Sequence, residues 1–521
     1  QLAQANSTTD VVVTLLDLPV TRLYRGAAQH VVLPREITPI QIEQTLNDLS
    51  TRYRRVWVVW SEAASPVVQA QVRNWLTQAA QEAQSTQFGA THVAAYDFKP
   101  NRLGQLEPLR AQFNGNFALL GVTAVPRGRA ADVALRWQAL TPASPAYSAT
   151  LQLIDDSGAV WQVGGSAIQD ADQFPTPRWL NGQVAEQIVR LDLPDEAPPG
   201  RYRVRVSVDQ ADGQRVGLFS AAGVFSGTAP VLTTVNLPAL DRPLTTLRRA
   251  IEYPFAHSWA DQIEVLGFDS GPGVVINGDL WAVDVVWRSR AETLPNLGII
   301  WEVRDLVGQK MFSTRLPLSS YATVLWRNGE VIGARYTLRF PVELTPADYQ
   351  VFLGVTTPDG ALLPGGLFKP FEVRLLARER SFTPPTAPTS KVLFSDPAIK
   401  LIGAQFPSGV QRPDSPLPVT LYWQAGTTTE QLYTVFVRLE SLNGQALTQI
   451  DSAPQGGGMP TASWATGQII EDVYPLTIPA DTPPGAYRVV VGLYNPLDGT
   501  HLIDTATGQG QVALEPPVVV K

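Results

Sequence analysis

Side chains that could carry out chemistry are few and widely separated in this 521-residue sequence. Its four histidines are His30, His92, His257 and His501, and none has a second histidine or a carboxylate at metal-ligand spacing. No cysteine is present to form a disulfide, bind a metal or act as a nucleophile. The Gly-x-Ser-x-Gly turn of serine hydrolases is also missing. We therefore expect no metal site, no cofactor, no catalytic residue and no enzymatic activity.

Three pairs of adjacent carboxylates are the remaining candidates for acid–base chemistry or cation binding. They are Asp155-Asp156, Asp195-Glu196 and Glu471-Asp472. The first pair falls in a predicted hairpin turn, and the other two fall in predicted loops or on strand surfaces. The sequence shows no partner that would shift their pKa values. We expect all three pairs to be surface groups.

The domain organisation can be predicted from a pattern of aromatic residues. This pattern occurs three times with nearly constant spacing. Repeats of this length indicate a string of similar domains. A tryptophan beside a loop can also stack on a sugar ring, but all three copies keep these aromatics, which favours a structural role. The repeated positions are Trp137, Trp287 and Trp423; Trp179, Trp326 and Trp464; and Tyr202, Tyr349 and Tyr487.

The residues around each repeated tyrosine predict a β-sandwich. Tyr202, Val204, Val206 and Val208 alternate with polar residues, as in a strand with one buried face. A tyrosine after a proline-rich corner is typical of Greek-key sandwiches, where its hydroxyl bonds back to the chain. Glycines end a second alternating run in each copy and predict hairpins, at Gly158, Gly308 and Gly444. We expect three Ig-like or jelly-roll antiparallel β-sandwiches of seven or eight strands each.

The first hundred residues have a different pattern, in which short apolar runs alternate with helical periodicity. Thr38 to Gln41 is a capping box with proline at the first helical position. A second helix is predicted from Ser65 to Ala83. No Gly-x-Gly-x-x-Gly or Walker loop occurs, so we expect no nucleotide cofactor. The segment predicts a small three-layer α/β domain.

Composition places the boundaries between these domains. Proline-rich stretches around Pro230 to Pro243 and from Ser381 to Ser390 predict linkers. We expect an α/β domain at 1–103, sandwiches at 104–226, 255–380 and 391–521, and linkers at 227–254 and 381–390.

A few residues that differ between the copies are candidates for binding. A carbohydrate-binding role would require exposed tryptophans that line a groove, and the candidates are Trp259 and Trp281, which have no tryptophan counterpart in the other repeats. Apolar residues on outer strand faces predict contact with a neighbouring domain or subunit. These interface candidates are Phe352, Val490 and Tyr494.

Charge and hydropathy restrict the partners further. The net charge is −7 and the basic residues are dispersed, which argues against a nucleic-acid partner. No apolar run approaches the roughly 20 residues that span a bilayer. We expect a protein or glycan partner.

The third repeat resembles the C-terminal sandwich modules of bacterial membrane glycosyltransferases related to protein O-mannosyltransferases and aminoarabinose transferases. Tyr433 to Leu439, Pro460 to Trp464 and Pro483 to Tyr494 carry the similarity. Arg54 to Trp60 resembles the soluble α/β segment of the same enzymes. The resemblance implies an extracytoplasmic location and a membrane tether upstream. The family's catalytic acids lie between membrane helices, so none is assigned to this chain.

The sequence therefore favours a non-catalytic extracytoplasmic recognition or scaffold protein at the cell surface, as the soluble part of a glycosyltransferase-like membrane protein or as a separate protein. One alternative is a carbohydrate-binding accessory module of a glycosyltransferase. Another is a subunit of a surface layer or extracellular filament, which would be a homo-oligomer or a larger assembly.

Overall fold

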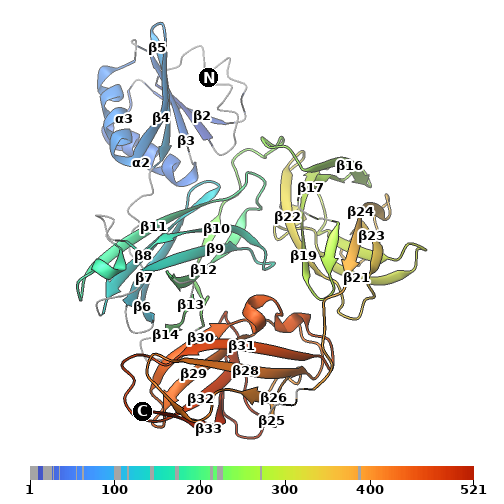
Figure 1. The fold of residues 1–521 in the computed structure, drawn as a ribbon. Coiled ribbons are helices and arrows are strands. Elements are labelled where there is room, and N and C mark those ends of the chain that lie inside the picture. Colours follow the sequence, from blue (N-terminus) through green and yellow to red (C-terminus); the bar gives the residue numbers. More distant parts are fainter. Residues whose placement is uncertain are drawn as a thin grey trace.

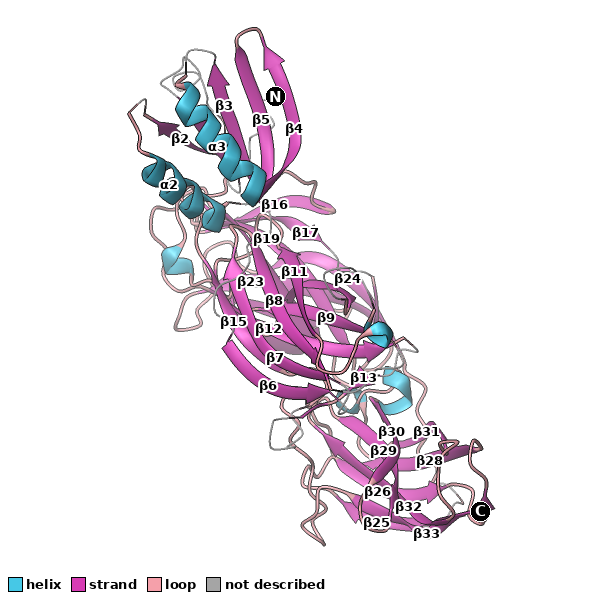
Figure 2. Ribbon diagram, turned by 90° about the vertical axis from the view of Figure 1, so that its left-hand side faces the viewer, coloured by secondary structure: helices cyan, strands magenta, loops and turns pink. Residues whose placement is uncertain are grey.

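The computed structural model contains one α/β domain followed by three β-sandwiches (Figure 1). The predicted fold class, mainly β with three tandem sandwiches behind an α/β domain, is confirmed. Figure 2 shows the α/β domain at one end of an elongated molecule and the third sandwich at the other. The structure describes residues 10–15, 26, 28–34, 36–53, 55–61, 64–98, 107–113, 117–140, 146–169, 175–211, 215–219, 227–269, 271, 273–384, 386 and 389–521.

The described elements of the α/β domain are β1 (Asp10–Leu15), β2 (Gln29–Leu33), α2 (Pro39–Arg52), β3 (Arg55–Ser61), α3 (Pro66–Ala79), β4 (Ala80–Phe88) and β5 (Thr91–Phe98). The sheet order is β2-β1-β3-β5-β4, and β1 pairs in parallel with β2 and β3. The capping box of α2 is confirmed, because Thr38 accepts from the Gln41 N–H while the Gln41 side chain accepts from the Thr38 N–H. The two helices contact each other on one face of the sheet (Figures 1 and 2).

One feature of this domain differs from the prediction. The second helix ends at Ala79 rather than Ala83, and β4 follows it directly. This edge strand is polar and exposed, so it has no apolar alternation to reveal it. Both described helices cover the same face of the sheet. The predicted third layer stays a prediction, because residues 16–25, between β1 and β2, lie outside the described residues.

The first sandwich packs two antiparallel sheets around one apolar core. Their orders are β10-β9-β12-β13, with β15 also paired to β12, and β11-β8-β7-β6-β14. The strands are β6 (Glu107–Phe113), β7 (Phe117–Pro126), β8 (Ala130–Ala139), β9 (Tyr147–Ile154), β10 (Val160–Ala167), β11 (Val184–Asp192), β12 (Gly200–Gln210), β13 (Arg215–Val216), β14 (Leu218–Phe219) and β15 (Val231–Leu237).

The second sandwich has the sheets β16-β17-β19-β22 and β18-β24-β23-β20-β21. Its short edge strand β18 pairs in parallel with β24 and is too short to show alternation, which explains why its sequence predicted fewer strands. The strands are β16 (Tyr253–Trp259), β17 (Ile263–Asp269), β18 (Val274–Ile276), β19 (Leu280–Ser289), β20 (Gly298–Arg304), β21 (Lys310–Pro317), β22 (Val331–Arg339), β23 (Ala347–Thr356) and β24 (Phe368–Leu376).

The third sandwich repeats this topology, with the sheets β25-β26-β28-β31 and β27-β33-β32-β29-β30. The strands are β25 (Thr389–Leu393), β26 (Ile399–Gln405), β27 (Val410–Gln411), β28 (Pro416–Ala425), β29 (Thr434–Ser441), β30 (Ala446–Ser452), β31 (Ile469–Thr477), β32 (Gly485–Tyr494) and β33 (Val512–Val520). Short 3₁₀ turns interrupt the sandwiches at η1 (Thr176–Arg178), η2 (Thr323–Leu325), η3 (Pro454–Gly457) and η4 (Thr461–Ser463).

The first set of repeated tryptophans lies in the three cores. Trp137, Trp287 and Trp423 are each fully buried. Their indole N–H groups donate to different partners, which are the Gln187 side chain at 3.0 Å, the Tyr336 hydroxyl at 3.2 Å and the Asp472 carboxylate at 3.2 Å. A buried indole needs such an acceptor.

The second set follows a 3₁₀ turn in each sandwich. Trp179, Trp326 and Trp464 are at most 2 % exposed. The threonine three residues before each tryptophan accepts from a main-chain N–H at the start of a strand or directly before it, namely that of Tyr147, Leu297 or Tyr433. The threonine hydrogen bond and the buried tryptophan together attach each 3₁₀ turn to its sandwich, which agrees with a structural role.

The third set forms the predicted tyrosine corner in all three copies. The hydroxyls of Tyr202, Tyr349 and Tyr487 donate to the main-chain carbonyl four residues upstream, at 2.6, 2.7 and 2.7 Å. The hairpin glycines are also confirmed, because Gly158, Gly308 and Gly444 have φ angles of 92°, 90° and 90°, which favour glycine.

The predicted linkers are partly wrong. Residues 231–237 form β15, which pairs with β12, so this part of the 227–254 linker belongs to the first sandwich. Pro230 and Pro238 lie just outside this edge strand, where proline is tolerated. In the 381–390 linker, Ser381 bridges to Ile469 and β25 begins at Thr389. The predicted 103/104 boundary lies outside the described residues.

Candidate functional site: junctions and clefts between the domains

The two tryptophans predicted to contact a glycan are core residues. Trp259 is 0 % exposed and Trp281 is 3 % exposed. The indole of Trp259 packs on Trp287 and donates to the Gly366 carbonyl at 2.8 Å, whereas Trp281 packs edge-on against Trp301, Phe340 and Phe371. Neither ring faces solvent, so the prediction that they line an exposed groove is wrong.

Two of the three interface candidates are covered by this chain itself. Val490 and Tyr494 are 1 % exposed and form a cluster with Phe436 on the outer face of the third sandwich. His501 packs against the rings of this cluster, and Thr228 of the preceding connector lies near the Tyr494 hydroxyl. Phe352 is half-buried beneath the guanidinium of Arg304. The covered outer face of Val490 and Tyr494 therefore lies inside this chain rather than between subunits.

The carboxylate pairs are less exposed than expected. Asp155 is 3 % exposed and accepts from the Ser157 and Ala159 N–H groups and the Trp161 indole. Burial raises the pKa of Asp472, which is 1 % exposed.

Glu196 is 4 % exposed and lies at a domain junction. The expectation of surface groups is therefore wrong for Asp155, Asp472 and Glu196. It holds for Asp156, whose side chain is half exposed and pairs with Arg201.

The first and second sandwiches meet around Glu196. Its carboxylate accepts from Arg249 at 2.8 Å, and Arg249 also pairs with Asp269 of β17 at 2.6 Å. Its main-chain carbonyl accepts from the Gly333 N–H of β22 at 2.6 Å. Nearby, Arg335 donates to the Val160 carbonyl and stacks over Trp161 at 4.7 Å. Main chain and side chains of both sandwiches thus interlock.

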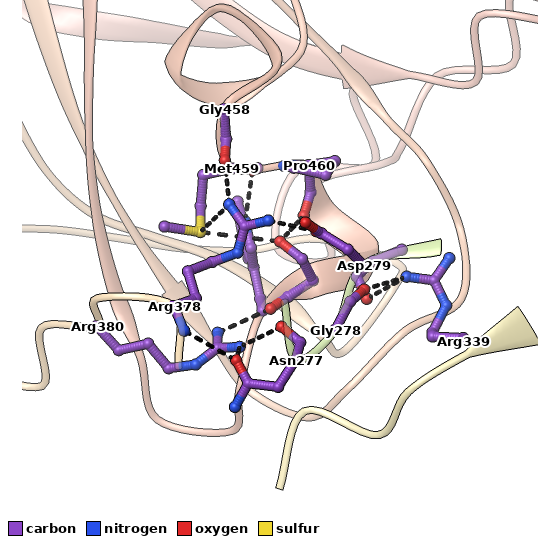
Figure 3. Close-up of polar contacts among 12 residues, drawn as sticks. Asn277, Gly278, Asp279, Arg339, Arg378, Arg380, Gly458, Met459 and Pro460 are labelled. Atoms are coloured by element: carbon purple, nitrogen blue, oxygen red, sulfur yellow. Dashed lines mark hydrogen bonds and ion pairs between the residues drawn. The ribbon is translucent and has the colours of Figure 1, made fainter. Parts of the chain in front are cut away.

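The second and third sandwiches meet through arginines that reach main-chain carbonyls (Figure 3). Arg380 donates to the Ser463 carbonyl at 2.8 Å and to the Gln468 side chain at 2.5 Å. Its other nitrogen donates to the carbonyl of Asn277 at 3.1 Å. One guanidinium therefore joins the two sandwiches.

Two further arginines repeat this arrangement. Arg378 binds both Asp279 and the Gly458 carbonyl. Arg339 donates to the Gly278 and Ala462 carbonyls, both at 2.8 Å. Figure 3 shows Arg378 beside Gly458 and Met459, whereas Arg339 lies beside Gly278. Planar guanidinium groups suit such multiple contacts.

The α/β domain is joined to the first sandwich by a similar device. Asp132, which is fully buried, pairs with Arg127 at 3.1 Å and Arg190 at 2.8 Å. These arginines donate to the main-chain carbonyls of Ser50 and Phe98 in the α/β domain, at 2.5 and 2.9 Å. All four domains are therefore connected by specific polar contacts.

The first and third sandwiches touch at the connector that follows β14. The Ala229 N–H donates to the Pro496 carbonyl at 3.2 Å. A Cβ atom on Gly227 would lie 2.5 Å from the same carbonyl oxygen, so the approach is close. Beside this contact lies a cleft of about 1110 Å³, which we name the polar cleft. Its walls come from β9 and β12 of the first sandwich and from β29, β30 and β31 of the third.

Two other hollows contain groups of different character. A cleft of about 950 Å³ between the first two sandwiches exposes mainly apolar atoms, although polar side chains such as Arg315, Arg335 and Asp359 also line it. A hollow of about 620 Å³ in the α/β domain contains Trp60, on which His92 stacks at 4.5 Å and over which Arg73 lies at 4.9 Å.

Within the described part of the chain, no three His, Asp or Glu side chains come close enough together to hold a metal ion. A helix with the length and hydropathy of a membrane span is likewise not found among the described residues.

The junction residues were missed at the sequence level because nothing local marks them. Arg378 and Arg380 immediately precede the predicted linker, but their acceptors are carbonyls about eighty residues away. The motif Thr-x-x-Trp-x-x-Gly-(Gln/Glu) recurs at Thr176, Thr323 and Thr461 and could have been found. Its last residue turns back to cap an N–H, as Gln468 does for Ala465 at 2.9 Å.

Comparisons with known proteins identify no family. No family model matches this chain, and no curated protein matches it. Among solved structures, the FN1–FN3 domains of chicken CNTN1 are 11 % identical with a TM-score of 0.18, over 80 % of this chain and 100 % of that one. Native alpha-2-macroglobulin of E. coli is 10 % identical with a TM-score of 0.15, over 83 % of this chain and 26 % of that one. Because both TM-scores are far below 0.5, these two structures carry no argument about this chain. The fold assignment therefore depends on the sheets described above.

Proposed function

We propose that this chain is a non-catalytic extracytoplasmic scaffold at the cell surface, in which three sandwiches and an α/β domain form one fixed body. The observation that carries the proposal is the set of arginines that cross each junction, above all Arg380, which binds main-chain carbonyls of two sandwiches. Tandem domains on flexible linkers move relative to one another. Charge-assisted hydrogen bonds to main-chain carbonyls instead define one relative orientation.

A second line of support is the resemblance of the third sandwich and the α/β domain to the soluble region of bacterial membrane glycosyltransferases. On this proposal, the chain is the part of such a protein that lies outside the membrane, and any glycosyltransferase activity belongs to a different segment. The junctions then hold the recognition surfaces in a constant position relative to the membrane. The partner is a protein or a glycan of the cell surface.

Small-angle X-ray scattering tests the scaffold. We expect one fixed arrangement to reproduce the scattering curve of the wild-type chain across a concentration series. The variant Arg380→Met should scatter as a more expanded particle. A wild-type curve that requires an ensemble of extended arrangements would contradict the proposal.

Surface labelling of cells that produce the full-length protein tests the location. We expect a membrane-impermeant amine reagent to label lysines of this chain, such as Lys310, on intact cells. Labelling only after lysis would contradict the extracytoplasmic location.

The alternative role as a surface-layer or filament subunit loses part of its support in the structure. It relied on the outer faces around Phe352 and Tyr494. The face around Tyr494 is covered within the chain, and Phe352 is half-buried beneath Arg304. The alternative of a carbohydrate-binding module keeps support from a different place, which is the polar cleft.

A further inference from the structure

The polar cleft holds a cation without a carboxylate partner. Arg205 lies on the outer face of β12, and its guanidinium donates to the Gln152 side-chain oxygen, with its Nε at 2.8 Å. Within the described residues it makes no ion pair, whereas the neighbouring Arg215 pairs with Asp209 at 2.9 Å. Burial, together with the charges of Arg203 and Arg215, lowers the pKa of Arg205. An anion in the cleft would relieve this unfavourable environment.

The facing wall offers hydrogen-bonding groups rather than a second cation. On β30, the carboxyl of Asp451 accepts from the Gln449 amide at 2.7 Å. Hydroxyls of Thr448, Ser452 and Thr477 also line this wall. A ligand that places a negative group at Arg205 and several hydroxyls toward β30 would match both walls.

The dimensions and apolar portions of the cleft fit the same ligand. Its volume of about 1110 Å³ is slightly above the roughly 300–1,000 Å³ of sites for drug-sized ligands, and it suits a short oligosaccharide. Tyr433 and Pro460 line it and offer the apolar surface on which sugar rings pack. The cleft forms only where two sandwiches meet, which is a common place for ligand sites.

We infer that the polar cleft binds an acidic oligosaccharide, whose sugar carboxylate pairs with Arg205 and whose hydroxyls face Asp451 and Gln449. This moves the carbohydrate-binding role from the buried Trp259 and Trp281 to a surface that the sequence did not indicate. The inference deepens the proposed function. It rests on the fixed arrangement of the domains, because the first and third sandwiches must stay together to form the two walls of the polar cleft.

Isothermal titration of the complete chain with two acidic probes, tri-galacturonic acid and a hyaluronan tetrasaccharide, tests the site. We expect at least one to bind. The matched uncharged probe is the methyl ester of the bound sugar, and it should bind at least tenfold more weakly. Arg205→Gln should also lose at least tenfold in affinity, whereas Arg205→Lys, which keeps the charge, should lose less. Arg201→Gln is the matched control, because Arg201 lies on the same strand face outside the polar cleft.

Three results would overturn the inference. The first is that neither acidic probe binds at concentrations up to about 10 mM, because a dissociation constant above that value is too weak for a specific site. The second is equal affinity of the wild type and Arg205→Gln. The third is displacement by acetate at the same concentration as the oligosaccharide, which would indicate a site for small anions. Scattering of the same samples separates the two proposals: a closed particle that does not bind contradicts only the saccharide site, and an opened particle contradicts the scaffold.

Discussion

The main-chain carbonyl of Glu196 accepts a hydrogen bond from the main-chain N–H of Gly333 at 2.6 Å, although the two residues belong to different sandwiches. The space around Gly333 leaves little room for a side chain. A Cβ atom on Gly333 would lie 2.9 Å from the Cγ atom of Glu196 and 3.1 Å from the ring of Trp161. The first and second sandwiches therefore touch as closely as two neighbouring strands do.

Gly333→Ala should separate these two sandwiches. The added methyl group overpacks the junction, and we expect a loss of about 1–3 kcal/mol in the free energy that holds it closed. Hydrogen exchange of β22, residues 331–339, should accelerate, and thermal unfolding should begin at a lower temperature.

Gly273→Ala is the matched control for this prediction. A Cβ atom there has nothing within 4 Å, and the residue is not in the left-handed region. We expect its exchange and melting to stay close to wild type. Unchanged exchange of β22 in Gly333→Ala would show that the junction accommodates the methyl group.

Arg380→Met should loosen the second and third sandwiches. The change removes charge-assisted hydrogen bonds to Ser463, Gln468 and Asn277 and leaves their acceptors buried, at a cost of about 2–3 kcal/mol. We expect faster proteolysis near Ser381, because opening of the junction frees the main chain that is held by the hydrogen bond from the Ile469 N–H to the Ser381 carbonyl. Arg412→Met, at an exposed arginine of the third sandwich, should leave the cleavage rate unchanged.

The tyrosine corners should each contribute similarly to stability. Tyr202→Phe removes the hydroxyl that donates to the Pro198 carbonyl, and we expect a loss of about 1–2 kcal/mol in the free energy of unfolding. Tyr487→Phe should cost about as much in the third sandwich, since its geometry is the same. Urea denaturation followed by tryptophan fluorescence measures both.

Tyr422→Phe provides the reference for the two corner variants. This tyrosine lies on the outward face of β28, and its hydroxyl has no protein partner among the described residues. We expect a change below about 0.5 kcal/mol. Equal effects of all three variants would remove the corner hydrogen bond as a source of stability.

Much of the fold could be predicted because its determinants are local. Alternating apolar residues mark strands such as β12, and a tyrosine after Pro-Pro-Gly marks the corner, wherever the rest of the chain lies. Strands without these signals were missed. The polar edge strand β4 reads as the end of a helix, and β15, between Pro230 and Pro238, reads as a linker.

The candidate site could not be predicted, because burial in it comes from neighbouring domains. The sequence around Glu196 is that of an ordinary loop. Glu196 becomes part of a domain junction only because Arg249 and Gly333 approach it in the folded chain. Trp259 and Trp281 have no counterpart in the other repeats, which suggests a binding role on sequence grounds alone. The structure shows that the second sandwich simply uses more aromatics to fill its core.

The stability of the third sandwich should depend on pH through Asp451. Burial outweighs the hydrogen bonds from Gln449 and Tyr494 and the charge of Arg438, and it raises the pKa of Asp451 from 3.8 to about 6. Across the polar cleft lie Arg205, Arg215 and Asp209. The acid form is therefore favoured in the folded state.

An acid whose pKa is higher in the folded than in the unfolded state contributes its full stability below the unfolded pKa, here 3.8, and loses it as the pH rises through about 6. As the pH rises from about 4 to about 7, we expect the free energy of unfolding of the third sandwich to decrease by at most about 3 kcal/mol. Its thermal midpoint should decrease over the same pH range. Asp451→Asn cannot ionise, so it should flatten this decrease and melt above the wild type at pH 7. Asp481→Asn, at an exposed carboxylate of the same sandwich, should follow the wild-type profile. A wild-type slope retained in Asp451→Asn would assign the pH dependence to a different group, with Asp472 the next candidate because burial raises its pKa as well.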